Sequence, residues 1–269
     1  KLDRANKIIC NFLWYGETAI FNKKKDILIF HNPISQIPHR YDFSKKYIDY
    51  NSSIVFDSHH SLNQFKAMDE KYNNCKMIHT GVDTEYFKPS EKKKNKNRLS
   101  LICLSEFEER KGIQYLIKAM PELIKQFPSV FLRIIGSGKS KKHYEDLINQ
   151  LNVGDYVDIQ PPVNDTKPYL LMADIYFLLS EGEGFPLGLL EAMSCGLPVI
   201  TSNYPPFNEI DDKVIQKVNR YNINDIITAI KNLHEVNNYK VFSNRSRTYV
   251  KNYHSWKMVA EKYYSYLVH

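Results

Sequence analysis

Apolar residues in this chain follow two patterns, short runs of strand length and a longer stripe with the spacing of a helix. The stripe runs from 113 to 127 and predicts a core-facing helix, which Pro121 should kink or divide in two. The short runs, which predict strands, lie at 99–104, 131–135, 156–159, 175–179, 198–201 and 214–218. Strands that alternate with helices in this way predict an α/β fold with a parallel, doubly wound sheet.

The region before residue 91 predicts a smaller domain of the same kind. Strands are expected there at 7–12, 26–30, 53–57 and 76–80, with helical or loop segments between them. Residues 91–98 (EKKKNKNR) are highly charged and lack apolar periodicity, so they predict an interdomain linker. We therefore expect a first domain at 1–90 and a second at 99–269, whose final helix at 255–269 can pack back on the first.

The segment 183–201 (EGFPLGLLEAMSCGLPVIT) carries the most informative chemistry. Pro186 suits the first turn of a helix, and Gly196 would end that helix. Glu183 is then expected in a loop at the carboxyl end of a strand, and Glu191 about one turn inside the helix. Ligands bind at that edge of open α/β sheets, and a helix N-terminus favours phosphate. Both carboxylates could accept hydrogen bonds from sugar hydroxyls; the alternative is that both are solvated surface residues.

Composition favours a soluble globular enzyme. The net charge of +7 allows a polyanionic partner, but no aromatic residues interleave with the basic linker, so nucleic acid is not expected. No apolar run approaches the ~20 residues that cross a bilayer. The chain starts at Lys1 without a signal-peptide pattern, and its 4 cysteines are scattered. We expect buried, reduced thiols in a cytoplasmic protein. The start at Lys1 rather than Met is compatible with a natural start upstream or with a naturally reduced N-terminus.

Five motifs in a fixed order resemble one enzyme family. They are the E-x7-E pair at Glu183 and Glu191, together with 109–112 (ERKG), 134–138 (IIGSG), 78–83 (IHTGVD) and 255–256 (SW). This arrangement resembles the retaining GT-B glycosyltransferases of the "glycosyl transferases group 1" type, over roughly residues 50–269. The resemblance implies two Rossmann-like domains with parallel sheets, the first one reduced. The family's glycine-rich loop near the start is absent, because Gly16 is the only glycine before Gly81.

The resemblance also implies roles for individual residues around a nucleotide-sugar donor, such as a UDP- or GDP-sugar. Lys111 would contact the donor diphosphate, Glu183 the transferred sugar and Glu191 the ribose. His31 would lie near the donor sugar, with His39, His59 and His60 as competing candidates. The other donor-binding candidates are Arg110, Gly136, Gly138, the backbone of Val163, Gly184 and Phe185.

Some of these roles have alternatives. Glu106 stands where the family usually has an arginine, so either Arg110 substitutes for it or the site is weaker than usual. Gly136 and Gly138 could instead serve only a tight turn that needs positive φ. No D-x-D pair occurs, and we expect neither a metal nor another cofactor.

The predicted function is a retaining, metal-independent transfer of a sugar to a hydroxyl of a glycan, a lipid-linked acceptor or a protein. The alternative is a non-catalytic sugar-nucleotide-binding or scaffold subunit. Lysines at 23–25 and 45–46, with Tyr47 and Tyr50, would suit peripheral contact with an anionic membrane, unless they are simply solvated.

Overall fold

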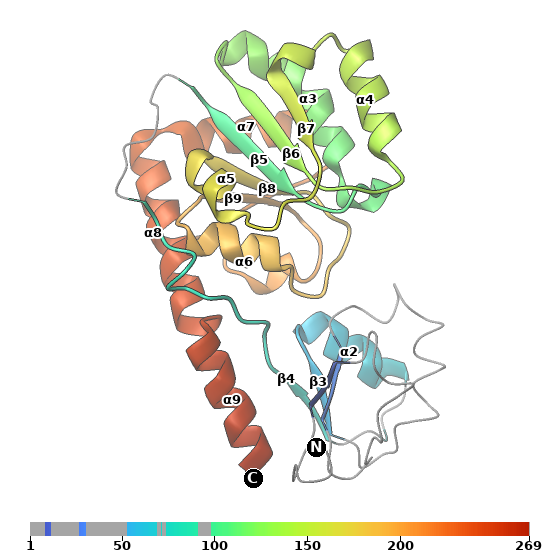
Figure 1. The fold of residues 1–269 in the computed structure, drawn as a ribbon, viewed down its shortest axis with the longest axis vertical. Coiled ribbons are helices and arrows are strands. Elements are labelled where there is room, and N and C mark those ends of the chain that lie inside the picture. Colours follow the sequence, from blue (N-terminus) through green and yellow to red (C-terminus); the bar gives the residue numbers. More distant parts are fainter. Residues whose placement is uncertain are drawn as a thin grey trace. The chain divides into compact units, whose positions relative to one another are not determined.

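A computed structural model describes residues 9–11, 27–30, 53–68, 71, 74–90 and 98–268 (Figure 1). The chain divides into two compact units. The first unit takes up two late segments of the chain, a short loop and most of the last helix. Its parts are Lys1–Thr80, Gly182–Pro186 and Lys257–His269, and those of the second unit are Gly81–Glu181 and Leu187–Trp256.

The second unit is built on a parallel six-stranded sheet in the order β10-β9-β8-β5-β6-β7. The chain runs outward from β5 to β7 and then returns to the other side of β5, which makes a topological switch point between β5 and β8. The predicted doubly wound sheet is confirmed, with each expected strand of this unit present. The strands are β5 (Ser100–Leu104), β6 (Phe131–Ile135), β7 (Val157–Gln160), β8 (Ile175–Leu178), β9 (Val199–Ser202) and β10 (Gln216–Val218).

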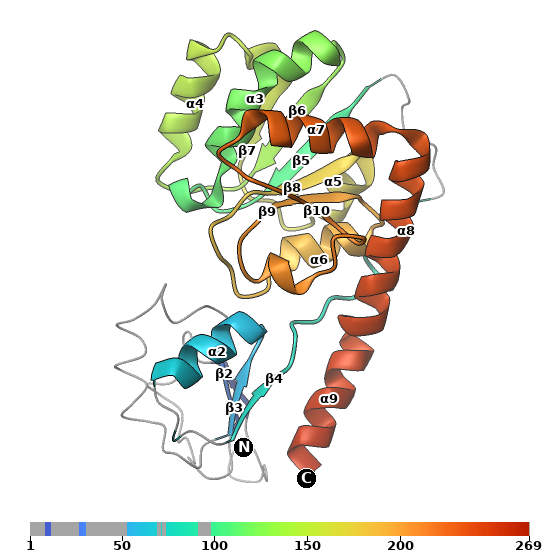
Figure 2. The same ribbon diagram turned by 180° about the vertical axis from the view of Figure 1, so that it is seen from behind.

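Helices cover this sheet in two groups. In the first group, α3 (Ile113–Gln126) contacts α4 (Lys141–Gln150) and α7 (Ile223–His234), and Figure 2 shows this group from the side of α7. In the second group, α6 contacts α5 and α8, and α8 also contacts α7. This second group consists of α5 (Lys167–Met172), α6 (Leu187–Ser194) and α8 (Val236–Tyr253).

Helix α3 continues through Pro121, so it is not divided in two. Its apolar stripe is buried on both sides of the proline, as Leu116, Ile117 and Leu123 show with exposures of 1% or less. Packing of one continuous apolar face outweighs the hydrogen bond that proline removes.

The first unit contains a parallel sheet in the order β1-β2-β3-β4. Its faces are covered by α2 (His59–Met68) and by α9 (Trp256–Val268). The ring of Phe56 packs on Phe65 of α2 at 5.0 Å, whereas Val55 faces the other way and packs with Val259 of α9. The strands are β1 (Ile9–Asn11), β2 (Ile27–Phe30), β3 (Ser53–Phe56) and β4 (Cys75–Met77).

Cys75, Cys103 and Cys195 are free thiols, and Cys103 and Cys195 are buried. None of the described helices combines the length and the apolar character that crossing a membrane requires.

Candidate functional site

Lys111 lies at the carboxyl edge of the second unit's sheet, just after β5. It ends the short 3-10 helix η3 (Glu109–Lys111), and its side chain is only 9% exposed. Gly112 follows with φ +75°, and a Cβ there would collide with the carbonyl oxygen of Leu179. Glycine is therefore required at this position, because the turn lies directly against the chain that leaves β8.

The backbone before Lys111 is held by side chains from elsewhere in the unit. Three consecutive carbonyl oxygens, those of residues 108, 109 and 110, each accept a side-chain hydrogen bond. The donors are Tyr144 Oη to Glu108 (3.0 Å), Gln114 Nε2 and Arg220 Nη2 to Glu109 (2.8 and 3.2 Å), and Arg220 Nη1 to Arg110 (2.8 Å). The turn is thus fixed before any ligand arrives. Arg220 was not among the residues singled out from the sequence, and no motif surrounds it that could have pointed to it.

The side chain of Arg110 already has an acidic neighbour. Its Nε lies 2.7 Å from Glu108 Oε2, and both side chains are about one-third exposed. Part of the positive charge that would replace the family's usual arginine is therefore offset within the turn itself. The substitution of Arg110 for an arginine at position 106 stays a prediction.

Gly136 and Gly138 follow β6 and lie against the loop after β5. A Cβ at Gly136 would collide with the Ser105 carbonyl oxygen, and one at Gly138 would lie 2.6 Å from the oxygen of Phe107. Phe107 N also donates to Ser137 O at 2.7 Å. Both glycines therefore have a structural reason, close backbone approach, which matches the tight-turn alternative. Their contact with a nucleotide stays a prediction.

Glu191 lies inside α6, as the sequence predicted, and α6 ends before Gly196, which has φ +75°. Thr166 Oγ1 donates to Glu191 Oε2 at 2.7 Å. Burial raises the pKa of Glu191, and the Thr166 hydrogen bond partly opposes that shift. Thr166 closes the loop after β7, which also holds the half-buried Val163. One hydrogen bond thus joins the two elements predicted to bind the base and the ribose.

The remaining candidates belong to the first unit. The segment Gly182–Pro186 is part of that unit, and Glu183, Gly184 and Phe185 are all buried. The ring of Phe185 packs against His79, with the ring centroids 5.2 Å apart. Glu183 is only 7% exposed, so the alternative of a solvated surface residue does not hold for it.

His79 is a second residue that the sequence reasoning passed over, although it lies within the 78–83 motif. Its Nδ1 is 3.1 Å from the carbonyl oxygen of Asp57. A carbonyl oxygen can only accept, so Nδ1 carries the hydrogen, and in the neutral ring Nε2 is the acceptor. His31 and His39 lie outside the described residues. The other two competitors are in α2, where the ring of His59 lies 6.4 Å from that of His79 and His60 Nε2 lies 3.0 Å from Gln64 Nε2.

Six of the predicted site residues therefore share one edge of the second unit's sheet, in the loops or helices that follow β5, β6, β7 and β8. They are Arg110, Lys111, Gly136, Gly138, Val163 and Glu191. Within the described residues, His, Cys, Asp and Glu side chains do not gather in groups of three or more that could hold a metal ion. Donors and acceptors at this edge suit an anionic, hydroxyl-rich ligand.

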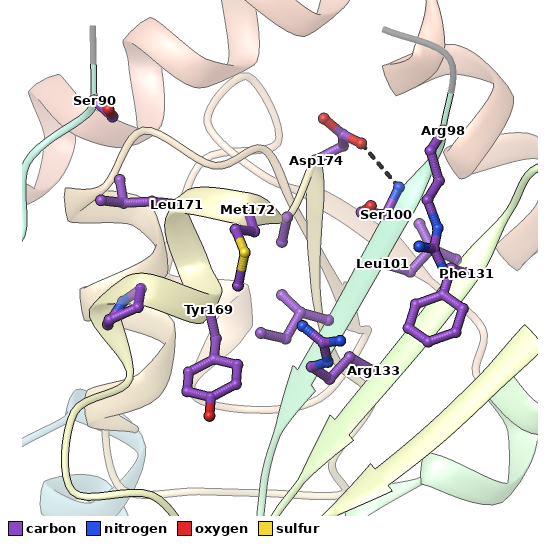
Figure 3. A pocket seen from close by; sticks show the side chains of 13 residues that line it. Ser90, Arg98, Ser100, Leu101, Phe131, Arg133, Tyr169, Leu171, Met172 and Asp174 are labelled. Atoms are coloured by element: carbon purple, nitrogen blue, oxygen red, sulfur yellow. Dashed lines mark hydrogen bonds between the residues drawn. The ribbon is translucent and has the colours of Figure 1, made fainter. Parts of the chain in front are cut away.

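A pocket of about 570 Å³ lies at the opposite, amino edge of the same sheet (Figure 3). Arg98 lies 3.8 Å from the centre of the Phe131 ring, and Asp174 Oδ2 accepts from Ser100 N at 2.8 Å. None of the predicted site residues lines this pocket. It is therefore separate from the candidate site.

Comparison with known proteins adds independent information. The family model described as "Glycosyl transferases group 1" matches residues 84–252. An uncharacterized glycosyltransferase of Haemophilus influenzae is 33% identical over 178 residues, which cover 63% of this chain and 48% of that protein. A GDP-mannose-dependent alpha-(1-6)-phosphatidylinositol monomannoside mannosyltransferase of Mycolicibacterium smegmatis is 26% identical over 199 residues, 67% of this chain and 52% of that protein. The chain thus spans about half the length of these relatives.

The fold comparison agrees. The crystal structure of Anabaena HepE in complex with UDP and glucose superposes with a TM-score of 0.80 at 15% identity, covering 91% of this chain and 71% of that one. At this identity the likeness concerns the fold alone. The predicted GT-B type α/β fold with parallel sheets is confirmed.

Proposed function

Because this chain belongs to the glycosyl transferases group 1 family, we propose that it transfers a sugar from a nucleoside diphosphate sugar to an acceptor hydroxyl. The proposed reaction retains the anomeric configuration and needs no metal. The acceptor is a saccharide, a lipid-linked molecule or a protein, reached from the cytoplasm, with or without peripheral contact with an anionic membrane. The mannosyltransferase relative, named for a phosphatidylinositol monomannoside, supports the lipid-linked class.

The hydrogen bond from Thr166 to Glu191 is the observation that carries this proposal. It ties the loop after β7 to α6, at the edge where doubly wound sheets bind nucleotides. A carboxylate held there can accept hydrogen bonds from both ribose hydroxyls, while the backbone at Val163 is in the same loop to meet the base. The base itself is left open by the relatives, since one is named for GDP-mannose and one was crystallised with UDP.

In this proposal the chemistry follows from charge. The acceptor oxygen forms a bond to the anomeric carbon while the bond from that carbon to the diphosphate oxygen breaks. The acceptor proton passes to the departing phosphate oxygen on the same face, so no separate protein base is required. Lys111 stabilises the negative charge that develops on the diphosphate, and Glu183 holds hydroxyls of the transferred sugar.

The second candidate is a sugar-nucleotide-binding subunit without catalysis. It is favoured by Glu106, which replaces the family's usual cation, and by the ion pair of Arg110 with Glu108 at 2.7 Å. Such a site would hold the nucleoside through Glu191 yet stabilise the departing diphosphate poorly.

Calorimetric titration of the purified chain with UDP and GDP tests the nucleotide-binding part. Incubation with the matching sugar donors, followed by proton NMR of the product, tests turnover and retention, and repetition with a chelator tests the independence from metal. Binding of one nucleotide with turnover supports the main proposal, and binding without turnover supports the subunit alternative. Failure to bind either nucleotide contradicts both.

A further inference from the structure

Arg220 is buried to an extent that is rare for its residue type. It follows β10 and is only 2% exposed. Arginine is almost never fully buried unless its charge has partners. Among the described residues its partners come from three separate segments, which follow β5, β8 and β10.

The first set of partners is the turn that carries Lys111. Arg220 Nη1 donates to Arg110 O at 2.8 Å, and Nη2 donates to Glu109 O at 3.2 Å. These are the two carbonyl groups immediately before Lys111. A planar guanidinium can reach both at once, which a lysine ammonium on a flexible stem cannot reproduce.

The second partner is the loop after β8. Glu181 Oε1 lies 3.7 Å from Arg220 Nη1, and the Tyr221 hydroxyl also bonds to this carboxylate. The backbone N of Glu181 donates to Arg110 O at 2.9 Å, so this one carbonyl oxygen accepts from both Glu181 and Arg220. The guanidinium thus links the turn after β5 to the loop after β8, across the switch point of the sheet.

Two aromatic rings fix the plane of the guanidinium. Its Cζ lies 4.8 Å from the centre of the Tyr115 ring and 5.4 Å from that of Tyr221, and the two rings meet edge-to-face at 5.1 Å. A side chain held in this way has one orientation, and it imposes that orientation on the carbonyls that it binds.

We propose that Arg220 is a positioning residue, which holds the turn of residues 109–111 so that Lys111 is presented to the diphosphate of the donor. The role of Lys111 in this statement rests on the proposed function. In this proposal Arg220 acts through the backbone carbonyls of the turn. Through these carbonyl groups Arg220 fixes the position and direction of Lys111 relative to the loop after β8.

The test compares Arg220→Lys and Arg220→Met with Arg247→Lys. Arg247 is a matched control, because it also donates to backbone carbonyls, those of Thr84, Phe87 and Ser194, each at 2.7 Å. The first measurement is amide hydrogen exchange without ligand. In the Arg220 variants we expect exchange at residues 109–112 to rise by about tenfold or more, and in Arg247→Lys to stay at the wild-type rate there.

The second measurement is the ratio of affinities for the nucleoside diphosphate and the matching monophosphate, using whichever of UDP and GDP the wild type binds. Arg220→Lys is expected to lower this ratio roughly tenfold, the loss of one charge-assisted contact. In a Lys111→Ala background the same change should lower it no further, because Arg220 acts through Lys111.

Unchanged amide exchange at residues 109–112 in the Arg220 variants would overturn the proposal. It would also be overturned if Arg220→Lys lowered the affinity ratio as much in the Lys111→Ala background as in the wild type. If the wild type binds neither UDP nor GDP, the proposed function fails, and the ligand-free exchange still decides the role of Arg220. If Arg220→Met does not fold, Arg220→Lys, which keeps the charge, supplies the same comparison.

Discussion

The turn that carries Lys111 and the helix that carries Glu191 lie at one edge of one sheet, yet they are held very differently. Three carbonyl groups of the turn accept hydrogen bonds from buried side chains, and Arg220 donates two of these bonds. Glu191 is positioned by its helix, and among the described residues its carboxylate accepts a hydrogen bond from the hydroxyl of Thr166 at 2.7 Å. This edge of the sheet therefore combines a rigid turn, which carries Lys111, with a carboxylate that is partly exposed.

The difference matches the task proposed for each residue. A cation that stabilises charge in the transition state must already be in place, so a rigid turn suits it. A carboxylate that exchanges water for ribose hydroxyls needs acceptor capacity, so it is left partly exposed. Substitutions at the two positions should separate turnover from affinity.

The largest effect is expected for Lys111→Ala. Removing one preorganised cation from the departing diphosphate should lower turnover by about 100-fold or more, with a much smaller change in the free energy of unfolding. The measurement is kcat with a saturating sugar donor, beside thermal unfolding. Lys118→Ala, on the exposed side of α3, is the control. A collapse of stability with unchanged turnover per folded molecule would make Lys111 structural instead.

The next effect concerns Glu191→Gln. Loss of a charged acceptor should weaken nucleotide binding by about 1–3 kcal/mol. The unliganded protein should be no less stable, because burial already disfavours the ionised form of Glu191 and raises its pKa. Calorimetric titration and denaturant unfolding measure the two quantities, and Glu145→Gln on α4 is the control. Unchanged affinity would remove Glu191 from the nucleotide site.

The raised pKa of Glu191 also predicts a pH dependence. A carboxyl whose pKa is higher in the folded than in the unfolded state contributes stability that is present below the ordinary glutamate range and is lost as the pH rises through the folded pKa. The free energy of unfolding of Glu191→Gln, taken relative to that of the wild type, should therefore increase from acid to neutral pH. The nucleotide affinity of the wild type should rise over the same pH range, since binding needs the ionised carboxylate. A constant difference across this range would contradict the assigned shift.

The fold could be predicted from the sequence because its signals are local. Runs such as 175–179 and the stripe after Gly112 specify strands and helices without reference to the rest of the chain. Pro121 shows the limit of such signals, since packing on both sides of the proline decided that α3 continues. Motif residues such as Lys111 and Glu191 could be placed at the correct edge for the same local reason.

The supporting residues could not be predicted in this way. Arg220 follows the Lys111 turn by more than a hundred residues. Thr166, which donates to Glu191, lies in a different segment from α6, the loop after β7. Their roles depend on the order of strands in the sheet, which brings distant loops to one edge. His79 carried a weak signal, its place in a motif, but its hydrogen bond to Asp57 O is visible only in three dimensions.

The smallest effect is expected for Thr166→Val, which removes the hydroxyl and keeps the shape of the side chain. The lost hydrogen bond to Glu191 should weaken nucleotide binding by roughly 0.5–1.5 kcal/mol at neutral pH. Because that bond opposes the rise of the Glu191 pKa, its loss should also shift the midpoint of the affinity-against-pH curve to higher pH. Thr166→Ser keeps the hydroxyl and should restore both values. A Thr166→Val variant with wild-type affinity and an unmoved midpoint would show that Thr166 only packs beside Glu191, and that the carboxylate is held by α6 alone.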